Sequence, residues 1–209
     1  MSEDLVKAIA DLKEEDALRI TRQRLESGDV PRLILEDSRK AMEIVGQRFA
    51  GGEYFMPDLI YSGEILKVVT EMVKPKLGQV AQTSRLAKFV LGTVAGDIHD
   101  IGKDIVSFML DVNGFEVHDL GVNVPPGKFV EKIAEVKPQI VGLSGFLTLA
   151  FDSMKETVEA IKAAGHRDQV KIMIGGGQMD AQVCKYAGAD AYGRDAMAGV
   201  MLAKQWTKG

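Results

Sequence analysis

Between residues 96 and 103 the chain reads Gly96-Asp97-Ile98-His99-Asp100-Ile101-Gly102-Lys103. The apolar run Phe89–Val94 precedes this segment and has the composition of a buried strand, while residues 104–112 have the pattern of a helix. In an open α/β sheet the turn after a strand lies at the ligand-binding edge. A histidine in such a turn, with a carboxylate nearby to fix its tautomer, suits a site that binds a metal or moves a proton.

The chain from residue 89 onward alternates between strand and helix patterns. Strands are predicted at residues 89–94, 116–119, 140–144, 171–174 and 190–192. Helices are predicted to begin near Lys103, Pro126, Leu149, Met179 and Asp195. Five strands that are each followed by a helix predict a doubly wound α/β domain, flavodoxin-like or Rossmann-like, with a five-stranded parallel sheet covered on both faces.

Residues 1–75 have a different pattern, in which apolar residues recur at helical spacing only. Glycines at 28, 51 and 52, and prolines at 31 and 57 that suit the first turn of a helix, divide this region into four helices. Four antiparallel helices with short connections predict an all-α bundle. Residues 76–88 are polar and weakly patterned, which predicts a linker between the bundle and an α/β domain at residues 89–209.

Composition restricts the classes of function. The 209 residues include a single cysteine, Cys184, which rules out an internal disulfide and suits a reducing, cytoplasmic location. No apolar run approaches the roughly 20 residues of a membrane span, and the acidic start of the chain is unlike a secretory signal. The net charge is −4 without a basic stripe, so neither a membrane nor a nucleic acid is expected as a partner.

Three of the predicted strand-to-helix turns carry unusual residues. They are Asp97–Gly102, Ser144–Thr148 and Gly175–Gln178, and right-handed crossovers place them along one edge of the sheet. Each turn has an ordinary explanation when taken alone. A lone histidine is more often structural, hydroxyls after a strand can cap the next helix, and glycines can serve a tight turn. Their combination at one edge favours a ligand site.

The residues of these turns resemble the signature of cobalamin-binding proteins. The pattern is Asp97-x-His99-x-x-Gly102, then 41 residues, then Ser144, and later the pair Gly175-Gly176. The resemblance implies that cobalamin binds with its own lower base displaced, in the base-off/His-on form. It makes His99 the lower axial ligand of cobalt and Asp97 the hydrogen-bond partner of that histidine, and these are the two catalytic residues that it implies.

The resemblance also implies which residues surround the cofactor. The nucleotide tail would pass Gly102 and enter a slot lined by Ser144 and Thr148, with the three glycines from 175 to 177 at its far wall. The residues expected to bind the cofactor in this domain are Asp97, Ile98, His99, Asp100, Ile101, Gly102, Ser144, Phe146, Leu147, Thr148, Gly175, Gly176 and Gly177.

The first half of the chain extends the resemblance. Residues 41–59 are similar to the helical cap of methyl-transferring cobalamin proteins such as methionine synthase. In that family the cap covers the upper face of the corrin ring. The resemblance therefore implies that Tyr54, Phe55 and Met56 lie near the upper face of cobalt, whereas the residues taken alone suit an ordinary bundle core.

Two positions depart from the family pattern. Phe146 stands where the signature usually has leucine, and we expect it to change only the packing around the nucleotide tail. Ala150 stands where methionine synthase has a serine that completes a proton relay with the histidine and the aspartate. Because alanine has no hydroxyl, the relay is expected to end at Asp97.

The resemblance implies a methyl carrier that is not catalytic alone. Cobalt(I) in cob(I)alamin takes a methyl group from a donor, and methylcobalamin gives it to an acceptor. Since the chain is too short to include a substrate-binding barrel, the expected partners are separate proteins. They are a donor methyltransferase, an acceptor methyltransferase that uses tetrahydrofolate, and a reductive activation protein. The leading expectation for the donor is an aryl methyl ether in an O-demethylase system.

Other donors and other classes of protein remain open at this point. Methanol, a methylamine or a betaine are alternative donors. A mutase subunit would bring a substrate barrel, and a cobalamin-binding sensor or regulator would need a DNA-binding module. A receiver-like signalling domain predicts a lysine after the last strand, where this chain has Gly193-Arg194.

Overall fold

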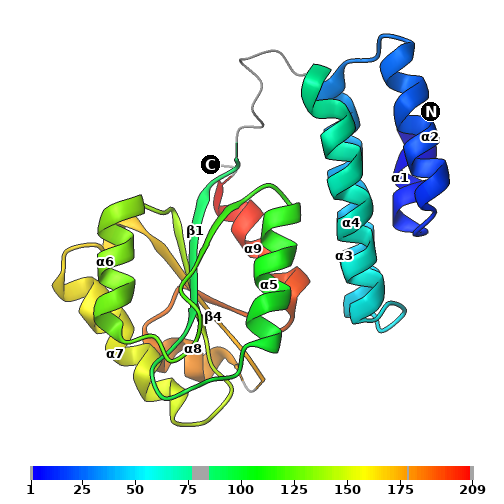
Figure 1. Ribbon diagram of the computed structural model, residues 1–209. Coiled ribbons are helices and arrows are strands. Elements are labelled where there is room, and N and C mark those ends of the chain that lie inside the picture. Colours follow the sequence, from blue (N-terminus) through cyan, green and yellow to red (C-terminus); the bar gives the residue numbers. More distant parts are fainter. Residues whose placement is uncertain (1, 77–84, 178, 208–209) are drawn as a thin grey trace. The chain divides into compact units, whose positions relative to one another are not determined.

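The computed structural model describes residues 2–76, 85–177 and 179–207 of the chain. The chain divides into two compact units, Met1–Ser84 and Arg85–Gly209 (Figure 1). Most of the predicted linker at residues 76–88 lies outside the described residues, as does Gln178 of the third predicted turn.

The first unit is a bundle of four helices, as the sequence predicts. The helices are α1 (Ser2–Ala10), α2 (Glu14–Glu26), α3 (Pro31–Ala50) and α4 (Met56–Val73), and a 3-10 turn at Lys74–Lys76 follows them. Helices α1 and α4 each pack against both α2 and α3. Pro31 begins α3, where its missing N–H group leaves no helical hydrogen bond unmade. The largest fully buried side chains of the bundle are Leu5, Ile9, Ile34, Met42, Leu59 and Ile65.

The second unit contains a parallel sheet of five strands, also as predicted. The strands are β1 (Lys88–Thr93), β2 (Glu116–Asp119), β3 (Ile140–Ser144), β4 (Lys171–Gly175) and β5 (Ala191–Gly193), in the order β2-β1-β3-β4-β5. The helices are α5 (Ile101–Val112), α6 (Pro126–Val136), α7 (Ala150–Ala163), α8 (Ala181–Ala187) and α9 (Ala196–Thr207), with a 3-10 turn at Arg167–Gln169. The predicted bounds of the second and third strands agree with the structure. The predicted first strand extends one residue too far, because Val94 forms an isolated bridge to Val124 instead.

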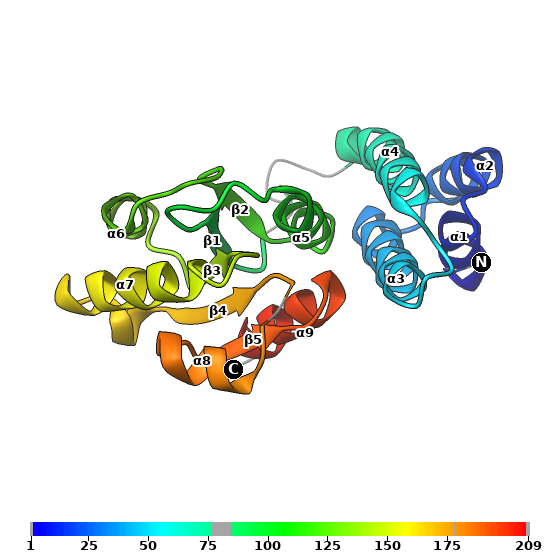
Figure 2. The same ribbon diagram turned by 90° about the horizontal axis from the view of Figure 1, so that it is seen from below.

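Helices cover both faces of this sheet. Figure 2 shows α6, α7 and α8 on one face and α5 and α9 on the other. On the first face, strand residues such as Val90 and Val141 pack against Phe129 of α6 and Met154 of α7. A Cβ atom on Gly92 of β1 would lie 2.9 Å from the Phe129 ring, so glycine at this position lets α6 approach the sheet closely.

The strand order positions the ligand edge. β1 and β3 are neighbours, yet the helices that follow them, α5 and α7, cover opposite faces. This is a topological switch point, where open α/β sheets bind their ligands outside the carboxyl ends of the strands. The register pairs Thr93 with Ser144, so the two strands end level and the loops after them begin side by side. Among the helices of the described residues, none is both long and apolar enough to cross a membrane.

Candidate cofactor site

Asp97 ties together the two loops at the switch point. Its side chain is fully buried, and its Oδ1 atom accepts the main-chain N–H of His99 at 2.9 Å and lies 2.7 Å from Nδ1 of the same residue. Its Oδ2 atom accepts the main-chain N–H groups of Phe146 at 2.6 Å and Leu147 at 3.0 Å. Burial raises the pKa of the Asp97 carboxyl, but these hydrogen bonds outweigh burial and hold that pKa well below its usual range. The carboxyl is therefore ionised at neutral pH.

His99 presents one free nitrogen at the same edge. Because an ionised carboxylate can only accept hydrogen bonds, Nδ1 of His99 carries the proton and donates it to Asp97. In the neutral form of the ring Nε2 is a lone-pair acceptor, and no hydrogen-bond partner for it is found among the described residues. The side chain is 49% exposed. A neutral imidazole oriented by a carboxylate has the form that metal-ligating histidines take in proteins.

The loop after β2 supports the backbone of the Asp97–His99 turn. The side-chain oxygen of Asn123 accepts the N–H of Gly96 at 2.8 Å, and the main-chain N–H of Asn123 donates to the carbonyl of Asp97 at 2.9 Å. Asn123 has a φ of 53°, a left-handed conformation that asparagine tolerates better than most residues. The buried hydroxyl of Thr93 donates to the carbonyl of His99 at 3.0 Å. Asn123 and Thr93 were not predicted as site residues, because their contacts join segments that are far apart in the sequence.

Lys103 joins α5 to the end of β2. Its side chain is 3% exposed, and Nζ donates to Asp104 at 2.5 Å and to the carboxylate of Asp119. Burial lowers the pKa of Lys103, but the two carboxylates outweigh burial and raise it above the ordinary value. This buried ion pair fixes the first turn of α5, on which Gly102 lies.

A cavity of 660 Å³ opens beside His99, between the strand ends and the α5 and α9 face of the sheet. This volume is within the range of small-molecule and cofactor sites. The predicted residues that line it are Ile98, His99, Asp100, Ile101, Gly102, Ser144, Phe146, Gly175, Gly176 and Gly177. Sequence reasoning missed other lining residues, which include Gly142, Gly145, Met173, Gly193, Arg194 and Gly199. Gly142, Met173 and Gly193 lie within strands, Gly199 lies in α9, and Gly145 and Arg194 lie in the loops directly after β3 and β5.

The glycines of the cavity serve two purposes. A Cβ atom on Gly102 would meet nothing within 4 Å, so a side chain there would enter open space beside the cavity. Gly176 has a φ of 138°, and its Cβ atom would lie 1.8 Å from the carbonyl oxygen of Gly145. A Cβ atom on Gly177 would lie 2.4 Å from the ring of Phe146. Gly176 and Gly177 line the cavity. The space left by their missing side chains is taken up by the neighbouring β3–α7 loop.

Two residues of the loop after β3 lie differently from what the sequence suggests. Thr148 is exposed and is not among the residues that line the cavity, so its contact with a bound cofactor stays a prediction. The reason is that the chain has already turned toward α7, since the Thr148 carbonyl accepts the N–H of Phe151. Phe146 was expected to change only the packing around the tail. Its ring instead lies against the imidazole of His99, with a centroid separation of 4.7 Å and an interplanar angle of 34°.

Ala150 is buried in the first turn of α7. Both oxygens of Asp97 are occupied by His99 and by two main-chain N–H groups. In this chain the hydrogen bonds of Asp97 other than those with His99 thus come from the backbone of the β3–α7 loop. Leu147 contributes one of them, although it does not line the cavity.

The predicted upper-face residues lie at the turn between α3 and α4. The Tyr54 hydroxyl donates to the carbonyl of Ala10 at 2.7 Å and accepts from Arg48 at 2.7 Å, which fixes this side chain within the bundle. Phe55 is 66% exposed, and Met56 is half-buried at the start of α4. Of the three, Phe55 has the side chain most available for contact. That these residues lie near cobalt stays a prediction.

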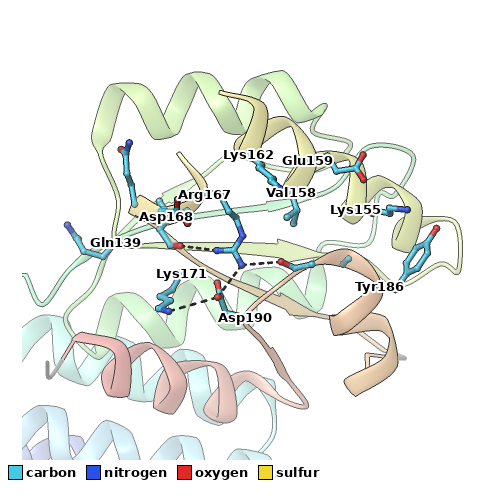
Figure 3. A pocket seen from close by; sticks show the side chains of 14 residues that line it. Gln139, Lys155, Val158, Glu159, Lys162, Arg167, Asp168, Lys171, Tyr186 and Asp190 are labelled. Carbon is cyan, nitrogen blue, oxygen red and sulfur yellow. Dashed lines mark hydrogen bonds and ion pairs between the residues drawn. The ribbon is translucent and has the colours of Figure 1, made fainter. Parts of the chain in front are cut away.

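A second cavity, of 720 Å³, lies at the amino ends of β3 to β5 (Figure 3). Its cations are largely paired within the protein. Arg167 donates to the carbonyl of Gly188 and pairs with Asp190 at 3.1 Å, and Lys171 lies 3.9 Å from the same carboxylate. This cavity is at the edge opposite the switch point and holds no predicted site residue.

The residues beside His99 fit a corrinoid. A single imidazole nitrogen is what a metal already held by a macrocycle needs as an axial ligand. The described residues contain no group of three or more histidine, cysteine or acidic side chains that could hold a bare metal ion. Ile98 and Ile101 are each 71% exposed next to His99, and provide an apolar surface for a large ring.

Comparisons with known proteins point to the same class of cofactor. Two family models, each described as a B12 binding domain, match residues 87–201 and residues 1–74. The trimethylamine corrinoid protein 1 of Methanosarcina acetivorans is 40% identical over 191 residues, which cover 90% of this chain and 88% of that protein. A cobalamin-binding protein from Desulfitobacterium hafniense has a similar structure, with a TM-score of 0.85, 42% identity and coverage of 99% of this chain and 98% of that one.

The methanol:cobalamin methyltransferase complex of Methanosarcina barkeri contains a chain of similar structure, with a TM-score of 0.81 and 25% identity over 99% of this chain and 79% of that one. The protein belongs to the family of corrinoid proteins with B12 binding domains. The predicted class of fold and the predicted family are thereby confirmed.

Proposed function

We propose that this protein is a corrinoid methyl carrier that receives a methyl group from a separate donor methyltransferase and passes it to a separate acceptor methyltransferase. The observation that carries the proposal is the geometry of His99. Its Nδ1 is bound by the buried carboxylate of Asp97, its Nε2 has no partner in the described structure, and it lies at a 660 Å³ cavity. The family and the similarity to a chain of a methanol:cobalamin methyltransferase complex support the same conclusion.

Different residues of the site would hold different parts of the cofactor. In the base-off/His-on arrangement, His99 would bind cobalt through Nε2, and the cavity lined by Gly102, Ser144 and Gly175 would hold the displaced nucleotide tail. When bound, the corrinoid supplies a cobalt centre that accepts and releases a methyl group. Asp97 keeps the imidazole in the tautomer with Nε2 free and places a negative charge beside it, which strengthens the imidazole as a ligand.

The donor that the comparisons favour is a methylated amine. The trimethylamine corrinoid relative is 40% identical across 90% of this chain, whereas the similarity to the methanol complex is 25%. These relatives give no support to the aryl methyl ether that the sequence suggested first. Methanol is the second candidate, because the structural similarity to that complex is high.

The experiment is reconstitution with hydroxocobalamin, reduction, and incubation with one purified donor methyltransferase at a time. Trimethylamine with its methyltransferase should methylate the bound cofactor, which is followed by its visible spectrum. Methanol and an aryl methyl ether, each with its own methyltransferase, serve as matched comparisons. Methylation from methanol or the ether alone would contradict the choice of donor, and failure of the protein to retain any cobalamin would end the carrier proposal.

In this proposal the first unit serves as a cap over the cofactor. We assign residues 1–75 to a cap and residues 89–209 to the cobalamin-binding domain, with the predicted linker at residues 76–88 between them. A cap that shields the upper face protects the reduced cofactor from water and oxidant. A reductive activation protein would restore cofactor that is oxidised, and the single buried cysteine suits a cytoplasmic setting. Phe55→Ala should speed the photolysis of bound methylcobalamin if Phe55 contacts the upper face, and an unchanged rate would contradict that contact.

A further inference from the structure

The hydrogen bond from Nδ1 to Asp97 does not by itself fix the plane of the His99 ring. A hydrogen bond tolerates departures of tens of degrees from linearity, and the imidazole is 49% exposed. A ring held only at one nitrogen could therefore tilt about that contact. A second contact, made to the face of the ring, is required to hold Nε2 in one direction.

The ring of Phe146 makes that second contact. Its centroid lies 4.7 Å from that of His99, with the two planes inclined by 34°. Aromatic pairs at this separation attract each other beyond the area that they bury. A flat ring also covers the face of an imidazole more completely than the branched leucine that the signature usually has here.

Phe146 is itself held in place from two sides. Its main-chain N–H donates to Oδ2 of Asp97 at 2.6 Å, so the same carboxylate orients both members of the ring pair. On the other side the ring packs against Gly177, where an added Cβ atom would lie 2.4 Å from Cε2 and 2.6 Å from Cδ2. The ring is thus seated between His99 and Gly177, although the residue as a whole is 51% exposed.

We propose that Phe146, backed by Gly177, is a positioning residue that holds the His99 imidazole in the orientation needed to ligate cobalt. The inference rests on the proposed function, because it assumes a corrinoid with His99 as its axial ligand. Without the ring, the cofactor would still enter the cavity, but histidine ligation would lose the benefit of an ordered imidazole. The strength of one aromatic contact predicts a decrease of about two- to tenfold in the ratio of histidine-ligated to histidine-free cofactor.

The test uses the full chain loaded with cobalamin in the cobalt(II) state. Electron paramagnetic resonance measures the histidine-ligated fraction through the splitting caused by the axial nitrogen. Phe146→Ala should lower this fraction relative to the wild type, and Phe146→Tyr, which keeps the ring, should restore it. Gly177→Ala should also lower it, since the added methyl displaces the ring from the opposite side. Tyr186→Ala is the matched control, because Tyr186 is 50% exposed and lines the cavity at the far edge of the sheet.

The outcomes separate the two proposals. An unchanged histidine-ligated fraction in both Phe146→Ala and Gly177→Ala would overturn the positioning role while leaving the carrier function in place. A wild-type protein that binds no cobalamin, or binds it without any histidine splitting, would overturn both. Circular dichroism of each variant checks that it is folded, and Phe146→Tyr distinguishes loss of the ring from a general disturbance of the loop.

Discussion

The Oδ1 atom of Asp97 lies 2.7 Å from Nδ1 of His99, and the carboxylate is fully buried while the imidazole is half exposed. The other oxygen of the same carboxylate binds two main-chain N–H groups of the β3–α7 loop. One side chain thus orients the candidate metal ligand and also joins two loops. Experiments can separate these two tasks. The orientation of His99 affects only the binding of the cofactor, whereas the joining of the loops affects the free energy of unfolding.

Replacing Asp97 should cost stability even without cofactor. In Asp97→Asn the side chain can accept through only one of its two terminal atoms, so N–H groups that are now bound by the buried carboxylate would face the amide NH₂. Buried donors without acceptors predict a loss of about 3 kcal/mol in the free energy of unfolding. Chemical denaturation of the apo protein measures it. Asp100→Asn is the control, since Asp100 is the exposed acidic residue next to His99 and should change the free energy by less than about 0.5 kcal/mol.

Because the space beside Gly102 is open, a large side chain at this position should block cofactor binding. Gly102→Leu places a side chain where a Cβ atom would meet nothing within 4 Å, at the wall of the 660 Å³ cavity. Cobalamin affinity, measured by equilibrium dialysis, should fall by about tenfold or more, while stability should not decrease. Gly127→Leu is a matched control, because Gly127 is also the second residue of its helix and also has open space around it. Equal affinities for the two variants would show that Gly102 is not on the path of the ligand.

The ion pair of Lys103 predicts a change in stability at alkaline pH. A group whose pKa is higher in the folded protein stabilises the fold below its unfolded pKa, which is about 10.4 for lysine, and this contribution is lost as the pH rises through the folded value. Lys103→Met should therefore be less stable than the wild type by about 1–3 kcal/mol between pH 6 and pH 9. The difference should shrink as the pH rises further. A difference that stays constant up to the highest pH at which the wild type is folded would contradict this account.

The sequence predicted the parts of the fold that depend on local patterns. Alternating strand and helix segments in residues 89–209 define a doubly wound sheet, and the strands at 116–119 and 140–144 were placed correctly. The combination of the Asp97–Gly102 turn with Ser144 and the three glycines selected a loop that lines the cavity of the structure. Most of the predicted cofactor residues line one cavity, because parallel strands deliver their following loops to the same edge.

Contacts between loops could not be predicted in the same way. The contact of Phe146 with His99 depends on the register of β1 with β3 and on the missing side chain of Gly177, which no local pattern reveals. Asn123 supports the Asp97 turn from the loop after β2, through one side-chain oxygen and one main-chain N–H. Thr148 lies outside the cavity lining because the chain is already turning toward α7, which begins at Ala150, and no local pattern shows where this turn begins.

The central claim is that His99 is the lower axial ligand of a bound corrinoid. Its most direct test is the electron paramagnetic resonance spectrum of the wild-type protein loaded with cobalamin in the cobalt(II) state, with natural and with ¹⁵N-labelled histidine. The account predicts that labelling changes the nitrogen splitting from a triplet to a doublet, and that His99→Ala abolishes this dependence on the label. A spectrum that is the same with and without labelled histidine would contradict it.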